Sequence, residues 1–303
     1  MSTQGITQAG EQIRTSTKKT ARGLGRETLA LRESILDMVA TGYIEPPFTV
    51  RQAFYRLTTI DASVEKTEAG YRRVQRQILH LRREGLLPYR YVADNSRVRR
   101  KPATHDSLAD ALETTAHFYR AAVWRDIDAY VEIWCEKTAL AGVMYPVTKR
   151  YDVPLLCASG YSSETFAYEA AQEMRESGKP GFIYYFGDFD PSGWQMAESL
   201  QKKLSKFNPR ATFKRVAVNP EQIDIMRLPS RPTKKTDTRY RKFVEMFGDV
   251  GSVELDAINP ATLRHLVQDC IEQHIPAGHL AAMADEEEAA RYALSQMARG
   301  TTL

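Results

Sequence analysis

The second half of the chain alternates short apolar runs with segments of helical periodicity, and this alternation restricts the possible folds more than any other feature. Runs rich in β-branched and aromatic residues occur at Tyr130–Cys135, Leu155–Ala158, Gly181–Gly187, Phe213–Val218 and Val253–Ile258. Helical patterns of about a dozen residues separate most of these runs. Consecutive strands that are joined by helices run parallel, so the sequence predicts an α/β domain with a mostly parallel sheet.

Acidic residues follow two of the predicted strands. The run YVEIWC leads directly into Glu136, and the run GFIYYFG leads into the motif DFDPSG, which contains Asp188 and Asp190. In parallel α/β sheets, functional groups gather at the carboxyl ends of the strands. The three carboxylates therefore predict an oxygen-rich site for Mg²⁺ or Mn²⁺. The alternative for an aspartate in such a loop is that it caps the next helix.

The segment before residue 104 is basic and has the pattern of a helix-turn-helix. Helices are predicted from about Arg26 to Ala40, from about Val50 to Leu57, and from about Glu68 to Glu84. Between Thr49 and Lys101 there are 13 Lys and Arg against 5 Asp and Glu, a local net charge of +8 in a chain of net charge +4. One basic module on a mildly acidic body indicates a polyanion bound at one place.

Arginines of this module are the candidate DNA contacts. In the third predicted helix an apolar stripe faces the core and the arginines lie largely off it, which suits the major groove and its flanking phosphates. The following segment, Pro88 to Pro102, is predicted to be a β-ribbon or wing with four arginines and a lysine. The predicted DNA-binding residues are Arg56, Arg72, Arg73, Arg76, Arg83, Arg97, Arg99, Arg100 and Lys101.

These patterns divide the chain into three parts. Residues 1–25 are polar, without apolar periodicity, and are predicted to form a flexible arm. Residues 26–103 are predicted to form a winged-helix DNA-binding domain, with a connecting helix from about Thr104 to Tyr119 opening the α/β domain of residues 104–303. No apolar run approaches the roughly 20 residues needed to cross a bilayer, and the expected location is cytoplasmic. The three scattered cysteines are expected to be reduced and make no zinc motif.

Two motifs in this order, WCEKTAL and YYFGDFDPSG, resemble the Toprim domain. In detail they resemble the A subunit of topoisomerase VI and its meiotic double-strand-break relatives. The stretch VRQAFYRL, Val50 to Leu57, is similar to the segment of that family that carries the catalytic tyrosine, and SVELDAI, Ser252 to Ile258, is similar to a segment that follows the acidic motif. The resemblance covers roughly Thr49 to Gln273.

The resemblance implies that Tyr55 is the nucleophile and that Glu136, Asp188 and Asp190 hold Mg²⁺ or Mn²⁺, with Glu136 also catalytic. Arg51 precedes Tyr55 by four residues, which would bring its guanidinium beside the phenol and favour the phenolate. Attack of the phenolate on phosphorus leaves a phosphotyrosine at the 5′ end and a free 3′ hydroxyl. The family's site forms between subunits, which implies a homodimer on double-stranded DNA in the nucleoid. Strand passage driven by ATP would need a separate ATPase subunit of the B type.

Three functions remain open. The first is DNA cleavage by tyrosine transesterification, as in a type IIB topoisomerase or a double-strand-break enzyme. The second is a Toprim nuclease that hydrolyses DNA with metal-activated water, in which Tyr55 is structural. The third is a non-catalytic DNA-binding subunit. Lys137, directly after Glu136, is expected either to contact the scissile phosphate or to extend into solvent.

Overall fold

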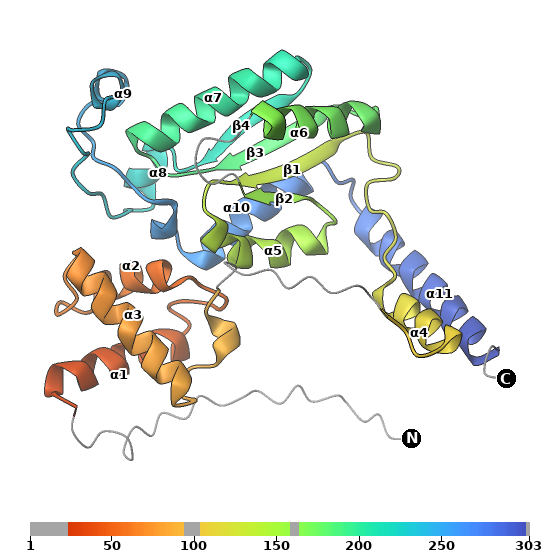
Figure 1. Cartoon of the computed structure of the whole chain (residues 1–303), viewed down its shortest axis with the longest axis horizontal. Coiled ribbons are helices and arrows are strands. Elements are labelled where there is room, and N and C mark those ends of the chain that lie inside the picture. The colour runs from red at the N-terminus through yellow and green to blue at the C-terminus, as the bar shows by residue number, and fades with distance from the viewer. Residues whose placement is uncertain (1–23, 94–103, 158–163, 301–303) are drawn as a thin grey trace. The chain divides into compact units, whose positions relative to one another are not determined.

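The computed structural model describes residues 24–93, 104–157 and 164–300, which are coloured in Figure 1. The chain divides into two compact units: one comprises the residues up to 93 together with 259–261, and the other comprises the rest. The predicted flexible arm and most of the predicted wing, including Arg97, Arg99, Arg100 and Lys101, lie outside the described residues. Within the described ranges, no helix has the length and apolar character needed to span a bilayer.

The N-terminal unit contains the three predicted helices, α1 (Arg26–Ala40), α2 (Val50–Ile60) and α3 (Glu68–Arg83). Two threonines fix where α2 and α3 begin. The Thr49 side chain accepts from the amide of Gln52 in a capping box, and the Thr67 side chain accepts from the amide three residues later. The first and third helices were predicted almost to the residue, and α2 runs three residues beyond the predicted Leu57.

The described part of the predicted wing differs from a ribbon. Tyr89–Tyr91 forms a short 3₁₀ helix, η1, and Val92 pairs with Phe48 in a single parallel bridge. The rest of the predicted wing lies in the range 94–103, which is not described. A winged-helix assignment of this unit therefore remains a prediction.

The second unit is built on a parallel sheet, as predicted. Its strands are β1 (Tyr130–Cys135), β2 (Leu155–Cys157), β3 (Gly181–Phe186) and β4 (Thr212–Ala217), and their order is β2-β1-β3-β4. All three pairings are parallel. The fold class is therefore α/β, with the two longest central strands, β1 and β3, side by side.

The fifth predicted strand, Val253–Ile258, was wrong. Val253 makes one antiparallel bridge to Phe189, and Leu255–Ala257 forms a 3₁₀ helix, η3. The amide of Leu255 donates to the Asp188 carboxylate over 2.8 Å. This contact holds the segment over the acidic turn, so it cannot join the sheet as a strand.

Helices cover both faces of the sheet (Figure 1). On one face, α6 (Glu164–Ser177) and α7 (Pro191–Phe207) pack on a core that contains Trp134, Tyr185 and Leu200. On the other face lie α5 (Ala141–Arg150) and α10 (Pro260–Glu272). The remaining elements are α4 (Leu108–Phe118), η2 (Thr138–Leu140), α8 (Pro220–Ile225), α9 (Tyr240–Phe247) and α11 (His279–Gly300), and α4 packs along α11.

Candidate active site

Glu136 and the DFDPSG motif meet because β1 and β3 are paired neighbours that end in register. Cys135 lies opposite Phe186, and the amide of Glu136 donates to the Phe186 carbonyl over 2.8 Å. Two residues beyond Phe186, the amide of Asp188 donates to Oε2 of Glu136 over 2.9 Å. The two carboxylates predicted to share a site therefore lie at one edge of the sheet.

Each of the three predicted ligands is held by a backbone amide through one of its two oxygens. Oε2 of Glu136 accepts from Asp188, Oδ1 of Asp188 accepts from Leu255, and Oδ1 of Asp190 accepts from the amide of Gly193 over 2.7 Å. Within the described residues, no hydrogen bond reaches the second oxygen of any of the three. Mg²⁺ and Mn²⁺ prefer oxygen ligands, and a carboxylate oxygen that accepts no hydrogen bond from a described residue is such a ligand.

Two glycines make room for the Glu136 carboxylate. A Cβ atom on Gly187 would lie 2.6 Å from Oε2 of Glu136, and a Cβ atom on Gly193 would lie 3.0 Å from the same oxygen and 2.6 Å from the Asp188 carbonyl oxygen. The two distances of 2.6 Å are too short for a real Cβ atom unless the neighbouring oxygen moves. The glycines that flank the acidic pair in the sequence are therefore required by the close packing of this site.

Lys137 differs from both expectations for it, because its ammonium group lies among carboxylates. Its Nζ atom is 3.0 Å from Oδ1 of Asp188, 2.8 Å from Oδ2 of Asp256 and 3.3 Å from Oε2 of Glu254. Arg231 forms an ion pair with the other oxygen of Glu254. The acidic cluster thus has five carboxylates, and a lysine of the chain supplies positive charge at its centre.

The electrostatics of the cluster reflect burial and crowding. Burial, reinforced by the neighbouring charge of Asp188, raises the pKa of Glu136 to about 7. Burial also raises the pKa of Asp188, although Lys137 opposes that shift. Burial alone would lower the pKa of Lys137, but Asp256 and Asp188 outweigh it and the pKa is raised. Lys137 therefore stays charged, and Glu136 is the carboxyl group that changes its protonation near neutral pH.

Three residues that the sequence reasoning missed complete the cluster. Arg215, from β4, donates to the Gly187 carbonyl over 3.0 Å and to the Asp188 carbonyl over 2.5 Å, and so fixes the acidic turn. Glu254 and Asp256 come from the segment that was predicted to be a strand. Their spacing of two residues, the same as that of Asp188 and Asp190, is the signal that could have found them.

Asp190 caps α7, which is the alternative role stated for it above. Two substitutions at this position should distinguish the effect of the cap on stability from the effect of the carboxylate on metal binding. Its carboxylate accepts from Gly193 at the start of the helix. Asp190→Ala is expected to lower the free energy of unfolding by about 1 kcal/mol, whereas Asp190→Asn, which keeps the accepting oxygen, should change it little. Both variants should bind Mn²⁺ more weakly if Asp190 is a ligand. Urea unfolding and a Mn²⁺ titration of the three proteins measure the two effects. Equal stability of the two variants would contradict the capping role.

The described residues do not gather into a ready metal site in this conformation. No group of three or more His, Cys, Asp and Glu side chains among them is arranged to hold a metal ion. Lys137 lies between Asp188 and Asp256, and the Asp190 carboxylate accepts from the Gly193 amide of α7.

Tyr55 and Arg51 belong to the N-terminal unit, on α2. The Tyr55 side chain is buried, with 3% of the residue exposed, and its ring centroid lies 5.5 Å from that of Phe54. The guanidinium of Arg51 lies over the Tyr71 ring, 4.2 Å from its centroid, and its support of the Tyr55 phenolate stays a prediction.

The predicted arginines of α3 fall into two groups. Arg72, Arg76 and Arg83 are exposed, and the first two line a shallow hollow along the helix. Arg73 is half-buried and donates to the carbonyl groups of Ser63 and Glu27, which is a structural contact. The guanidinium of Arg56 lies 5.8 Å from the centroid of the Tyr43 ring. The role of the exposed group as phosphate contacts stays a prediction.

Comparison with known proteins adds nothing to these observations. No protein-family model matches the chain, and no curated protein matches it.

Proposed function

We propose that the chain is a metal-dependent enzyme that cleaves DNA at the carboxylate cluster of the second unit. The observation that carries the proposal is the set of three carboxylates, Glu136, Asp188 and Asp190, each oriented by a backbone amide and each with a second oxygen that accepts no hydrogen bond from a described residue. These residues would hold Mg²⁺ or Mn²⁺, which neutralises the scissile phosphate and stabilises the leaving oxygen.

The residues of the chain contribute orientation and proton transfer. Gly187 and Gly193 let the Glu136 carboxylate approach the acidic turn, and Arg215 holds the carbonyl groups of that turn. Glu136, oriented by the Asp188 amide, would accept the proton of the attacking hydroxyl group. Exposed arginines of α3 would bind the phosphates of double-stranded DNA.

The proposal has two forms, which differ in the group that attacks the phosphodiester. In the first, Tyr55 attacks the phosphodiester as in the A subunit of topoisomerase VI, and the site is completed between the two chains of a homodimer, with a B-type ATPase subunit as a further partner. This form rests on the resemblance of the sequence motifs. In the second, water attacks and Tyr55 is structural. The 3% exposure of Tyr55 favours the second form.

A denaturing-quench adduct assay with labelled supercoiled DNA tests both forms. The wild type, Tyr55→Phe and Asp188→Asn would be incubated with Mg²⁺ or Mn²⁺ and then denatured. Asparagine at position 188 keeps an oxygen for the Leu255 amide and removes the negative charge. Asp188→Asn is expected to lose DNA cleavage by a factor of 100 or more, because the charge that binds the ion is lost, a step worth about 3 kcal/mol or more.

Tyr71→Phe is the matched control for Tyr55→Phe, because the rings of both tyrosines contact Phe54 in the same unit. Label trapped on the wild type and on Tyr71→Phe, but absent from Tyr55→Phe, supports transesterification. Cleaved DNA without trapped label, unchanged in Tyr55→Phe, supports hydrolysis. Salt-sensitive DNA binding without cleavage under any metal condition would sink the proposal and leave a non-catalytic DNA-binding subunit.

A further inference from the structure

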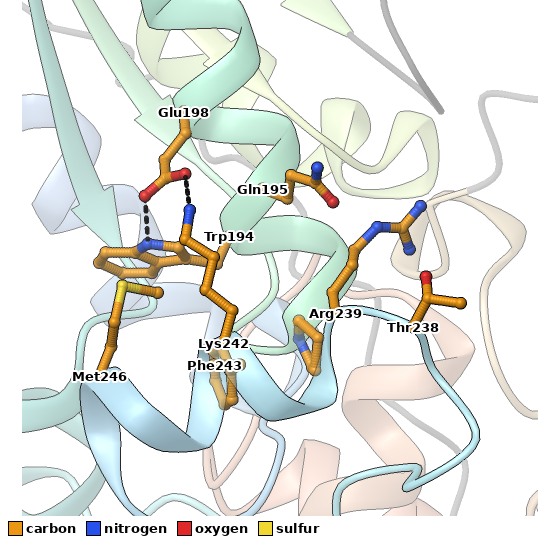
Figure 2. Close-up of a pocket in the computed structure, with 9 residues that line it drawn as sticks. Trp194, Gln195, Glu198, Thr238, Arg239, Lys242, Phe243 and Met246 are labelled. Carbon is orange, nitrogen blue, oxygen red and sulfur yellow. Dashed lines mark hydrogen bonds and ion pairs between the residues drawn. The ribbon is translucent and has the colours of Figure 1, made fainter.

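Beside the acidic motif, α7 and α9 enclose a pocket of about 420 Å³, shown in Figure 2. This volume lies in the range of ligand sites in proteins. Trp194, Phe243 and Met246 form its apolar part, and Met246 is 44% exposed. Gln195 and Thr238, both exposed, bring an amide and a hydroxyl to its rim. An apolar interior with polar groups at the edge suits a flat heterocycle such as a nucleobase.

A strongly basic segment leads into this pocket. Residues 231–242, RPTKKTDTRYRK, contain six Lys and Arg and one Asp, a net charge of +5. The side chains of Lys234 and Lys235 are exposed on consecutive residues before α9. Arg239 and Lys242 line the pocket itself. Cations spaced along a segment match a chain of phosphates better than a single small anion.

The ion pair of Lys242, one of the two lining cations, is exposed. Its ammonium lies 3.1 Å from Glu198, and 65% of the lysine side chain is exposed. Ion pairs with this degree of exposure contribute little to stability. A phosphate can therefore approach Lys242 without disrupting the fold. Arg239 is less exposed and lies 3.4 Å from Asp237.

Residues of the acidic motif and its surroundings contact the lining of the pocket. Pro191, which lines the pocket, directly follows Asp190. Phe189, between the two aspartates, packs against Phe243 with ring centroids 4.9 Å apart. Arg215, which holds the Asp188 carbonyl, also lies 5.0 Å from the centroid of the Trp194 ring. A nucleotide in the pocket would thus adjoin the carboxylate cluster.

We propose that the pocket between α7 and α9 takes one unpaired nucleotide of a DNA strand and that the 231–242 segment binds its flanking phosphates. The base lies against Trp194 and Met246, with Gln195 and Thr238 at its edge, and Lys234 and Lys235 face the adjoining phosphates. The proposal rests on the proposed DNA cleavage for the identity of the strand. It adds that the strand is locally unpaired, because a base can turn its edge to Gln195 and Thr238 only when that edge is not paired with another base.

Fluorescence anisotropy with the full chain in EDTA tests this inference. The probes are a labelled single-stranded oligodeoxynucleotide of mixed sequence and an abasic strand of the same length. The wild type is expected to bind the intact strand at least five-fold more tightly than the abasic strand, since base stacking is worth about 1–3 kcal/mol. Met246→Ala, an exposed change, should reduce this ratio.

The double substitution Lys234→Gln, Lys235→Gln should weaken binding of the intact strand roughly ten- to thirty-fold at 0.1 M salt. It should also make the slope of log K against log salt less steep by about 1.4, because each phosphate contact on a single strand contributes about 0.7. The matched control is Lys149→Gln, Arg150→Gln, two exposed cations at the end of α5 on the other face of the sheet. The control should bind like the wild type.

Two results would overturn the inference: equal loss of binding in the double variant and in its control, or equal affinity of the wild type for intact and abasic strands. Binding is measured without metal and without cleavage, so a protein that never cleaves DNA can still give the expected result. Conversely, a protein that cleaves DNA but fails these comparisons keeps the proposed function and loses this strand-binding site.

Discussion

Replacing Glu136 with glutamine is expected to raise the free energy of unfolding by about 3 kcal/mol at pH 8 and to abolish DNA cleavage. The pKa of Glu136 is about 7 in the folded protein, above its ordinary value of 4.5. Ionisation therefore costs the folded state free energy: the wild type keeps its full stability below pH 4.5 and loses about 3 kcal/mol as the pH rises through 7. Glutamine does not ionise, so the variant escapes this loss.

Urea unfolding in EDTA at pH 8 and near pH 4.5 measures this effect. The stability difference between Glu136→Gln and the wild type should be largest at pH 8 and should shrink to near zero near pH 4.5. Glu245→Gln serves as a control, because that exposed carboxylate pairs only with Arg241 one turn away and should shift stability by less than about 0.5 kcal/mol. A Glu136→Gln protein that is less stable than the wild type at pH 8 would contradict the raised pKa of Glu136.

Replacing Lys137 with methionine is expected to lower the free energy of unfolding by about 3 kcal/mol at neutral pH. The substitution leaves Asp188, Glu254 and Asp256 without the ammonium that faces them, and removal of one partner from a buried ion pair carries a cost of this size. Without the ammonium, the pKa of Asp188 would be raised further, whereas Glu254 keeps its ion pair with Arg231. The loss should therefore be greatest at high pH and should diminish as acid protonates the carboxylates.

Lys179→Met provides the matched control for Lys137→Met. The Lys179 ammonium donates to two backbone carbonyl groups, those of Trp124 and Arg125, and faces no carboxylate in these contacts. The decrease in the free energy of unfolding caused by Lys179→Met should therefore be nearly independent of pH. Unfolding curves for both variants at pH 5 and pH 8 distinguish the two cases. A pH-independent loss in Lys137→Met would show that the carboxylates do not depend on the lysine for their charge.

The parts of this structure that follow from local pattern and from simple topology were predictable. The strand and helix alternation after residue 104 gave the parallel sheet, and the pairing of adjacent parallel strands brought Glu136 and Asp188 to one edge. The capping threonines and the apolar stripe of α3 likewise fixed the helices of the first unit.

The unpredicted features depend on contacts between segments distant in sequence. The segment SVELDAI has the alternation of a strand, but the bond from the Leu255 amide to Asp188 holds it as a 3₁₀ turn. The sequence around Lys137 does not indicate that this lysine pairs with Glu254 and Asp256, which follow it by more than a hundred residues. The burial of Tyr55 depends on how α2 packs against α1 and α3, which the spacing of its own helix does not specify.

The lysine within the acidic cluster would act as a built-in competitor for cations. A cation entering between Asp188 and Asp256 would have to displace an ammonium group that already carries one positive charge. A monovalent ion such as K⁺ offers no more charge than the group it would displace and is also free to diffuse away, whereas a divalent ion brings one charge more. The tethered ammonium would therefore disfavour entry of a monovalent ion more than entry of a divalent ion.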